Sequence, residues 1–163
     1  MKFFKTFDIA ASGMKVEQKR MDVVSNNIAN AHTTKTADGS PYRRQVAVVS
    51  SQDASAFESA YEQASMGSEF SNIFEETGVG YGGRGAKVDG VAEDGSDFNW
   101  IYDPSHPDAM KEGPKAGYVA KPNVNIIQEM TLMMQATRAY EANATTVEAA
   151  KSMAMKALQI GKG

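Results

Sequence analysis

Residues 3–31 read FFKTFDIAASGMKVEQKRMDVVSNNIANA, and apolar side chains recur along them in alternating steps of four and three residues. A stripe sustained over about four heptads predicts a helix that packs along its whole length. Gly13 lies inside this stretch and disfavours a helix by about 1 kcal/mol relative to alanine, so the isolated helix should be weak. The stripe consists of Phe3, Phe7, Ala10, Met14, Glu17, Met21, Val24, Ile28 and Ala31, with Glu17 as its polar exception.

The same spacing returns near the other end of the chain and predicts a second long helix. Pro122 disfavours helix in the residue before it, and Asn125 and Gln128 have the spacing of an N-cap and its capping-box partner. Gly161 marks the end of this helix. The second stripe consists of Ile126, Met130, Met133, Thr137, Tyr140, Ala144, Val147, Lys151, Ala154 and Leu158, with Thr137 and Lys151 as polar exceptions.

The two helices are similar in length, and the region between them offers little apolar surface for either to bury against. We therefore expect a mainly α fold with a small β-rich insert, in which the long terminal helices pack antiparallel in coiled-coil fashion and against neighbouring copies. Residues 1–31 and 123–163 would form the helical core domain, and 32–122 the insert of strands and loops. The alternative is that each stripe is the core face of an ordinary globular helix.

Within the insert, β-branched and alternating residues predict short strands at 42–49, 85–93 and 98–102. Residues 51–83 are rich in serine, glutamate and glycine and lack a firm periodicity. We interpret this segment as a long flexible or lineage-specific surface loop, in which scattered aromatic residues leave a short helix open.

The composition excludes several classes of protein. The chain has no cysteine, so disulfides and thiolate metal sites are excluded, and its net charge of −3 argues against nucleic-acid binding. No apolar run is long enough to span a membrane, so membrane insertion is not expected. Asp8 interrupts the apolar start of the chain, which argues against a cleaved secretory signal.

Candidate chemical sites are weak. The glycine-rich stretch at 78–85 lacks the lysine and serine or threonine of a phosphate-binding loop. The segment from Asp103 to Glu112, with His106 and Asp108, could in principle bind a divalent metal. Its prolines favour a rigid turn in which aspartate and serine bond local backbone groups. We assign no catalytic, cofactor-binding or metal-binding residue and expect no enzyme activity.

Several motifs together resemble the rod and hook proteins of the bacterial flagellum. MDVVSNNIANA at 21–31, followed by YRR at 42–44, is similar to the N-terminal signature of that family. The later motifs resemble the C-type proximal rod subunits: YDP at 102–104, HPDA at 106–109, GYV at 117–119, PNVN at 122–125, EM at 129–130, RAYEAN at 138–143 and KSMAMKAL at 151–158. The resemblance covers about residues 1–50 and 84–163, and 51–83 lies outside it.

This resemblance implies a structural subunit of the proximal rod, the hollow drive-shaft that crosses the periplasm. It implies export by the flagellar type III apparatus without a cleaved signal, and assembly with copies of itself and other rod subunits. Assembly contacts would then be made by helix-stripe residues and two motif asparagines: Phe3, Phe7, Met14, Met21, Val24, Asn27, Ile28, Asn30, Ile126, Met130, Met133, Tyr140, Val147, Ala154 and Leu158.

Three alternatives stay open at this point. A distal rod or hook-related paralogue would need a longer β-rich middle region. A small metal-binding protein or hydrolase would use the turn from Asp103 to Glu112. A soluble coiled-coil adaptor would share the helices without joining a rod.

Overall fold

The structure of the chain, a computed structural model, describes residues 2–52 and 85–161, leaving aside the side chains of residues 2–4. Along the described sequence, four short strands lie between two long helices. The elements are α1 (Lys2–Ala29), β1 (Gln45–Ser51), β2 (Ala86–Glu93), β3 (Asn99–Tyr102), β4 (Tyr118–Lys121) and α4 (Ile126–Ile160).

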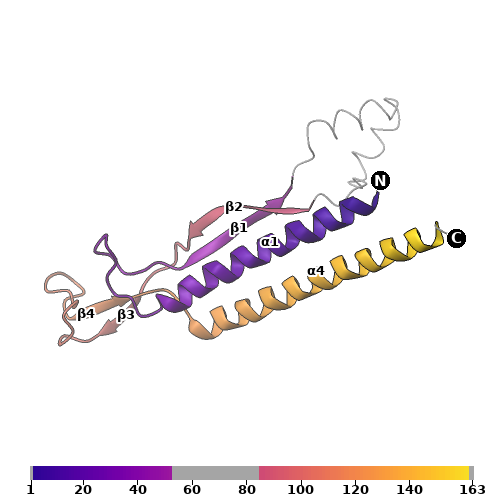
Figure 1. Cartoon of the computed structure of the whole chain (residues 1–163). Helices are drawn as coiled ribbons and strands as arrows, with labels where there is room; N and C mark the ends of the chain where they lie inside the picture. Colours follow the sequence, from indigo (N-terminus) through magenta and orange to yellow (C-terminus); the bar gives the residue numbers. More distant parts are fainter. Residues whose placement is uncertain (1, 53–84, 162–163) are drawn as a thin grey trace, which may run out of the picture.

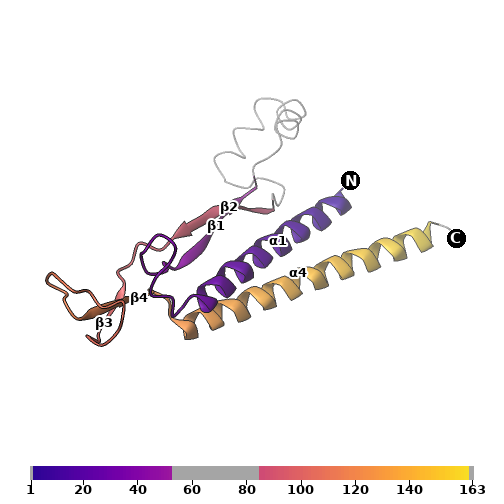
Figure 2. The same cartoon turned by 60° about the vertical axis from the view of Figure 1, so that its left-hand side comes forward.

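The elements form three layers, with α1 in the middle (Figure 1). The helix α4 runs antiparallel along one side of α1, and the β1–β2 hairpin lies along the other side. The β3–β4 hairpin lies beyond the end of α1, and the described ends of both helices near the termini lie together at the opposite end (Figures 1 and 2). The prediction of a mainly α fold with antiparallel terminal helices and a small β insert is confirmed.

The start of α4 follows from its cap. The side-chain oxygen of Asn125 accepts hydrogen bonds from the backbone N–H of Ile127 at 3.0 Å and of Gln128 at 3.4 Å. These two groups have no partner inside the helix, so the cap stabilises its first turn. The predicted N-cap is therefore confirmed.

The prediction that the insert offers the helices little apolar surface is wrong for α1. The half-buried Ala47 and Val49 of β1 alternate with exposed Val46 and Val48, which gives the strand one inward face. Ser12 of α1 also accepts a hydrogen bond from the backbone N–H of Ala86 at 3.1 Å. Because α1 is covered on two sides, its buried residues extend beyond one heptad stripe and include Val16 and Val23.

The strands differ from the sequence-based prediction in detail. The antiparallel pair β1–β2 contains a register shift between Val48 and Val49, and β1 begins later than expected. β4 was not predicted, and it pairs antiparallel with β3, with Trp100 opposite Ala120. Its four residues are too few to show a period, although Val119 is 2% exposed. The loop expected at 51–83 lies almost entirely outside the described residues, and so does any short helix within it.

Candidate functional site

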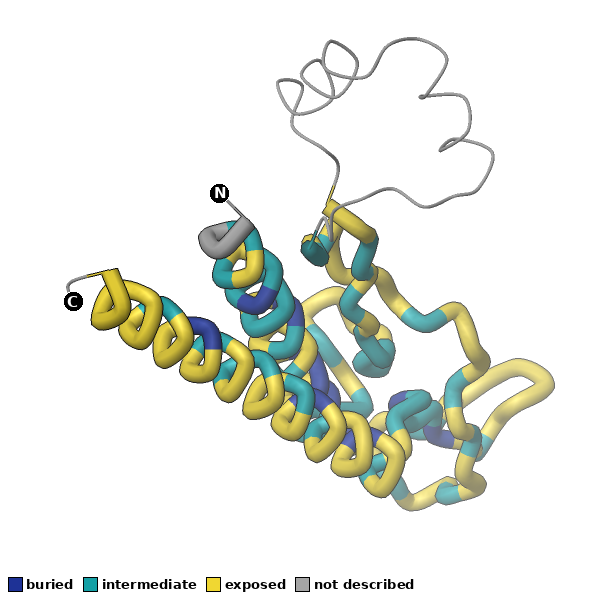
Figure 3. Tube along the Cα trace, turned by 90° about the vertical axis from the view of Figure 1, so that its right-hand side faces the viewer, coloured by how far each residue is buried: buried dark blue, intermediate teal, exposed yellow. Residues whose placement is uncertain are grey.

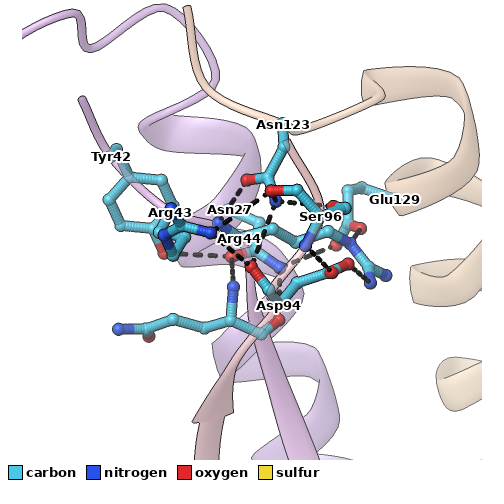
Figure 4. A network of polar contacts seen from close by, with 9 residues as sticks. Asn27, Tyr42, Arg43, Arg44, Asp94, Ser96, Asn123 and Glu129 are labelled. Atoms are coloured by element: carbon cyan, nitrogen blue, oxygen red, sulfur yellow. Dashed lines mark hydrogen bonds and ion pairs between the residues drawn. The ribbon is translucent and has the colours of Figure 1, made fainter. Parts of the chain in front are cut away.

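A buried polar cluster joins α1, α4 and both strands of the hairpin where α1 ends and α4 begins (Figure 4). Asn27 of α1 and Glu129 of α4 are both 0% exposed. The Asn27 amide nitrogen donates to Glu129 Oε2 at 3.0 Å and to the backbone oxygen of Gln45 at 2.8 Å. Its oxygen accepts from Tyr42 Oη and from the backbone N–H of Gln45, each at 2.9 Å. All four hydrogen-bonding positions of this side chain are thus occupied.

Arg44 completes the cluster by neutralising Glu129. Its Nε lies 2.6 Å from Glu129 Oε1, and its Nη1 lies 3.2 Å from Asp94 Oδ2 at the end of β2. Burial by itself lowers the pKa of Arg44, but the hydrogen bonds and charges of Glu129 and Asp94 outweigh it and raise the pKa. A buried carboxylate needs such a partner, because an unpaired buried charge costs several kcal/mol.

Neighbouring groups hold Arg44 in place. Its backbone N–H donates to the side-chain oxygen of Asn123 at 2.8 Å, and the Asn123 amide donates to Ser96 Oγ at 2.8 Å. The backbone N–H of Ser96 donates to Asp94 Oδ1 at 2.9 Å. Hydrogen bonds from Ser96, and then from Arg44, lower the pKa of Asp94. The cluster therefore fixes the position of α4 relative to α1 and the hairpin.

Burial also perturbs Tyr42, which closes the cluster on the α1 side. Its pKa is raised by burial first, and then by the negative charges of Glu129 and Glu93. The phenol therefore stays protonated and keeps donating to Asn27.

Nearer the termini, the helices approach through small residues. A Cβ atom placed on Gly13 would lie only 2.8 Å from the Asn143 side-chain nitrogen of α4. Gly13 therefore leaves room for the Asn143 side chain between the two helices. The sequence predicted only the cost of this glycine to the isolated helix; the structure shows that it permits the contact.

The packed face of α4 is offset from the predicted stripe. Its fully buried members are Glu129, Ala136 and Ala150, each one position before a stripe residue. The polar exceptions Thr137 and Lys151 are exposed, so the helix does not have to bury them. The stripe was built on large apolar residues, whereas close approach of two helices favours small ones.

Large apolar side chains instead remain uncovered on α4, whose yellow, exposed residues dominate one side of the helix in Figure 3. The exposed members are Ile127, Met130, Leu132, Met134, Tyr140, Met153, Met155, Leu158 and Ile160. Of these, Ile127, Met130 and Met134 lie on one side of the helix, opposite the buried Glu129 and Ala136. None of the described helices is both long and apolar enough to cross a bilayer.

The predicted assembly residues whose side chains are described fall into three groups. Met130, Tyr140 and Leu158 are exposed, whereas Val24 and Asn27 are buried inside the chain. Asn27 therefore has no surface to offer a neighbour, because every polar atom of its side chain is used internally. The half-exposed members are Phe7, Met14, Met21, Ile28, Asn30, Ile126, Met133, Val147 and Ala154. The side chain of Phe3 lies outside the described part of the chain.

The turn after β3 is organised by local bonds. Asp103 Oδ1 accepts from Ser105 Oγ at 2.6 Å and from the Ser105 backbone N–H at 3.2 Å, and this bonding lowers the Asp103 pKa. His106 Nδ1 accepts from the backbone N–H of Asp108, whose carboxylate accepts from Thr34 Oγ1. The predicted local bonding of this turn is confirmed at Asp103 and Ser105. In the part of the chain that is described, no three histidine, aspartate or glutamate side chains gather as a metal site would require.

Sequence reasoning missed the cluster of Asn27, Arg44 and Glu129. Other polar residues lie beside both helix members, such as Asn26 and Gln128, so nothing local marked Asn27 and Glu129 as the buried ones. A single sequence cannot pair residues separated by 102 positions, as Asn27 and Glu129 are.

Comparison with known proteins gives consistent matches at both ends of the chain. Residues 7–35 match the family described as "Flagella basal body rod protein", and residues 115–160 match "Flagellar basal body rod FlgEFG protein C-terminal". Curated relatives called "Flagellar basal-body rod protein FlgC" align over their full lengths. The chain is 39% identical to that of Borreliella burgdorferi over 100% of its residues, and 42% and 32% identical to those of Bacillus subtilis and Salmonella typhimurium over 99%.

Proposed function

The chain belongs to the FlgC family of flagellar basal-body rod proteins, and from this premise we propose that it assembles through the uncovered faces of its two long helices. It is a structural subunit of the proximal rod and not an enzyme. The rod is the site where it functions, together with other rod components.

The observation that carries the proposal is the exposed apolar surface of α4. Ile127 is 77% exposed, and Met130 and Met134 are 54% and 56% exposed on the same side of the helix. Leaving such side chains in water forfeits about 25 cal/mol for each Å² that a neighbour could cover. Burial against adjacent subunits thus favours assembly, and methionine adapts to neighbours of differing shape.

The buried cluster supports assembly in another way. Directional hydrogen bonds between Asn27, Arg44 and Glu129 hold α1 and α4 in one register within each subunit. A subunit that keeps its register presents the same surface to each neighbour. The cluster therefore acts inside the subunit, while the exposed residues act between subunits.

The proposal also includes the domain bounds and the contact residues expected from the sequence. Residues 1–31 and 123–163 form the assembling helical domain, and 32–122 form the insert of strands and loops. Among the predicted contact residues, the exposed Met130, Tyr140 and Leu158 are the main assembly contacts. Half-exposed residues contribute at the edges, and Asn27 is left out.

Export and location also belong to the proposal. The subunit would pass through the flagellar type III apparatus, keep its N-terminal residues, and function where the rod crosses the periplasm. Ala10 and Val16 are 5% and 3% exposed, and Gly13 contacts Asn143, so cleavage within the first 20 residues or so would remove packed parts of α1. Mass spectrometry of the subunit in isolated basal bodies should find the encoded N-terminus; a shortened chain would contradict this step.

The assembly proposal is tested in cells whose own copy of this protein has been removed. Met134→Asp should abolish rods in electron micrographs and abolish swimming, because it places a charge on the proposed contact surface. Met134→Leu is the matched control and should restore both. The purified Met134→Asp chain should unfold like the parent chain, and normal rods in cells producing it would refute the proposal.

A further inference from the structure

A groove of about 440 Å³ lies between α1, β1 and α4. Its walls are mainly aliphatic and include Val23, Val46, Leu132 and Ala139. Glu17 also lines it, and the Glu17 side chain is 12% exposed. Glu17 Oε1 pairs with Arg20 at 3.1 Å, but the buried Oε2 has no hydrogen-bond partner among the described residues. A buried carboxylate oxygen left in this way calls for a donor from outside the subunit.

The C-terminal end of α4 carries exposed apolar residues and a cation, which could complement the groove. Asn27 lies opposite Glu129, and Gly13 opposite Asn143. This antiparallel register carries the last turn of α4 beyond the first turn of α1, as Figure 1 shows. Met155 and Leu158 are accordingly 56% and 68% exposed.

These two residues share one helix face with a cation. Lys151, Met155 and Leu158 follow the i, i+4, i+7 spacing of a single face, and all three are exposed. The terminal stripe, as we call these three residues, combines an apolar surface with a positive charge. The groove combines an apolar surface with two carboxylates, each paired with an arginine: Glu17 with Arg20, and Glu129 with Arg44. Of their oxygens, the buried Glu17 Oε2 is the one left without a donor among the described residues.

We propose that the groove of one subunit receives the terminal stripe of a second copy, with Lys151 donating to Glu17 Oε2. Met155 and Leu158 then cover the aliphatic walls, and the unpaired carboxylate oxygen gains a charged partner. The inference rests on the proposed rod function and deepens it by naming the two surfaces that meet.

The positions of the two surfaces determine the kind of assembly. The stripe lies roughly 20 residues beyond the groove along α4, on the order of 30 Å at the helical rise. Groove and stripe are different surfaces, so the contact is head-to-tail and leaves a free groove and a free stripe after each addition. Such a contact builds an open filament when its rotation does not close a ring.

The absence of native cysteine makes a disulfide test direct. Two differently tagged full-length chains, Ala139→Cys in the groove and Leu158→Cys in the stripe, are produced together in cells lacking the native copy. Mild oxidation of isolated basal bodies should give a linked dimer that carries both tags. The double variant in one chain should give a ladder of higher multimers.

The matched control moves the second cysteine to the opposite side of the same helical turn. Lys156→Cys combined with Ala139→Cys should give no linked dimer above the background of each single variant. Equal linking by Lys156→Cys and Leu158→Cys would overturn the proposed orientation. Linkage of the groove cysteine to a different rod protein, after a cysteine scan of that protein, would overturn the choice of a second copy.

The charge pair gives a second readout. Lys151→Glu should lower the yield of the linked dimer roughly fivefold, and Lys151→Arg should keep it. Swimming of the cysteine variants under reducing conditions distinguishes failure of the groove-to-stripe contact from failure of the proposed rod function. Intact rods without groove-to-stripe linkage would overturn this inference alone, whereas basal bodies that lack this protein would overturn the proposed function itself.

Discussion

The two ends of the helix pair are held together by different forces. At the end where α4 begins, Asn27, Arg44 and Glu129 are joined by buried hydrogen bonds and an ion pair. Toward the termini, contact depends on small residues such as Gly13 and Ala150, and large apolar residues such as Leu158 remain in solvent. At the first end, the buried polar groups find their partners within one subunit. The second end has surface that only a neighbour can cover, so we infer that stability is concentrated at one end and assembly at the other.

The largest change in subunit stability is expected from Arg44→Met. It leaves the Glu129 carboxylate buried without its cation, which should lower the free energy of unfolding by about 3–5 kcal/mol. Arg43→Met is the control: Arg43 lies over the Phe98 ring at 4.5 Å and donates to the backbone oxygens of Asp94 and Ser96, but it pairs with no buried carboxylate, so its loss should cost far less. Urea unfolding followed by circular dichroism measures both. Adding Glu129→Gln to Arg44→Met should recover part of the loss; a further loss would contradict the charge argument.

A smaller change is expected from Gly13→Ala at the other end. The new Cβ would crowd Asn143 at 2.8 Å, and overpacking of this kind costs about 1–3 kcal/mol, offset by about 1 kcal/mol of helix propensity. Combining it with Asn143→Ala should remove the crowding and leave the double variant more stable than Gly13→Ala alone. The same unfolding measurement applies. If the effects of the two substitutions on the unfolding free energy were simply additive, crowding between residue 13 and Asn143 would not be the cause of the loss.

A smaller effect still is expected from titration of Asp94. Its folded-state pKa lies below its ordinary value of 3.8, because Ser96 and Arg44 stabilise the carboxylate. Its contribution to stability is therefore complete above the unfolded-state pKa and is lost as pH falls through the lower folded-state pKa. Unfolding curves from pH 6 down to about pH 2.5 should show a smaller loss in Asp94→Asn than in the parent chain. Identical pH profiles would show that Asp94 adds nothing to the cluster.

The smallest effect on stability, and a complete effect on assembly, is expected from Leu158→Asp. Leu158 is 68% exposed in the subunit, so its replacement should change the unfolding free energy by no more than about 0.5 kcal/mol. Rods should nevertheless fail to form in complemented cells, since a charge would replace the apolar contact. Leu158→Met is the control that keeps both properties. A folded Leu158→Asp subunit that supports normal swimming would contradict the inference that the end of the helix pair near the termini serves assembly.

Some features of the molecule could be read from particular residues. Asn125 predicted the start of α4, because an asparagine cap acts on backbone groups two and three residues away. The turn at Asp103 and Ser105 was likewise predictable, since both residues bond within a few positions. The short β4 strand and the register shift in β1 could not be predicted, because pairing with a distant strand decides them.

The sequence by itself determined that two long helices stand at the ends of the chain, because heptad spacing and caps are local properties. Its motifs also determined the resemblance to flagellar rod proteins. The tertiary structure decided which face of each helix is buried. It assigned Gly13 to a close helix contact, Asn27 and Glu129 to a buried cluster, and Leu158 to the surface. Burial depends on partners far apart in sequence, and the second side of α1 became buried only when the hairpin packed against it.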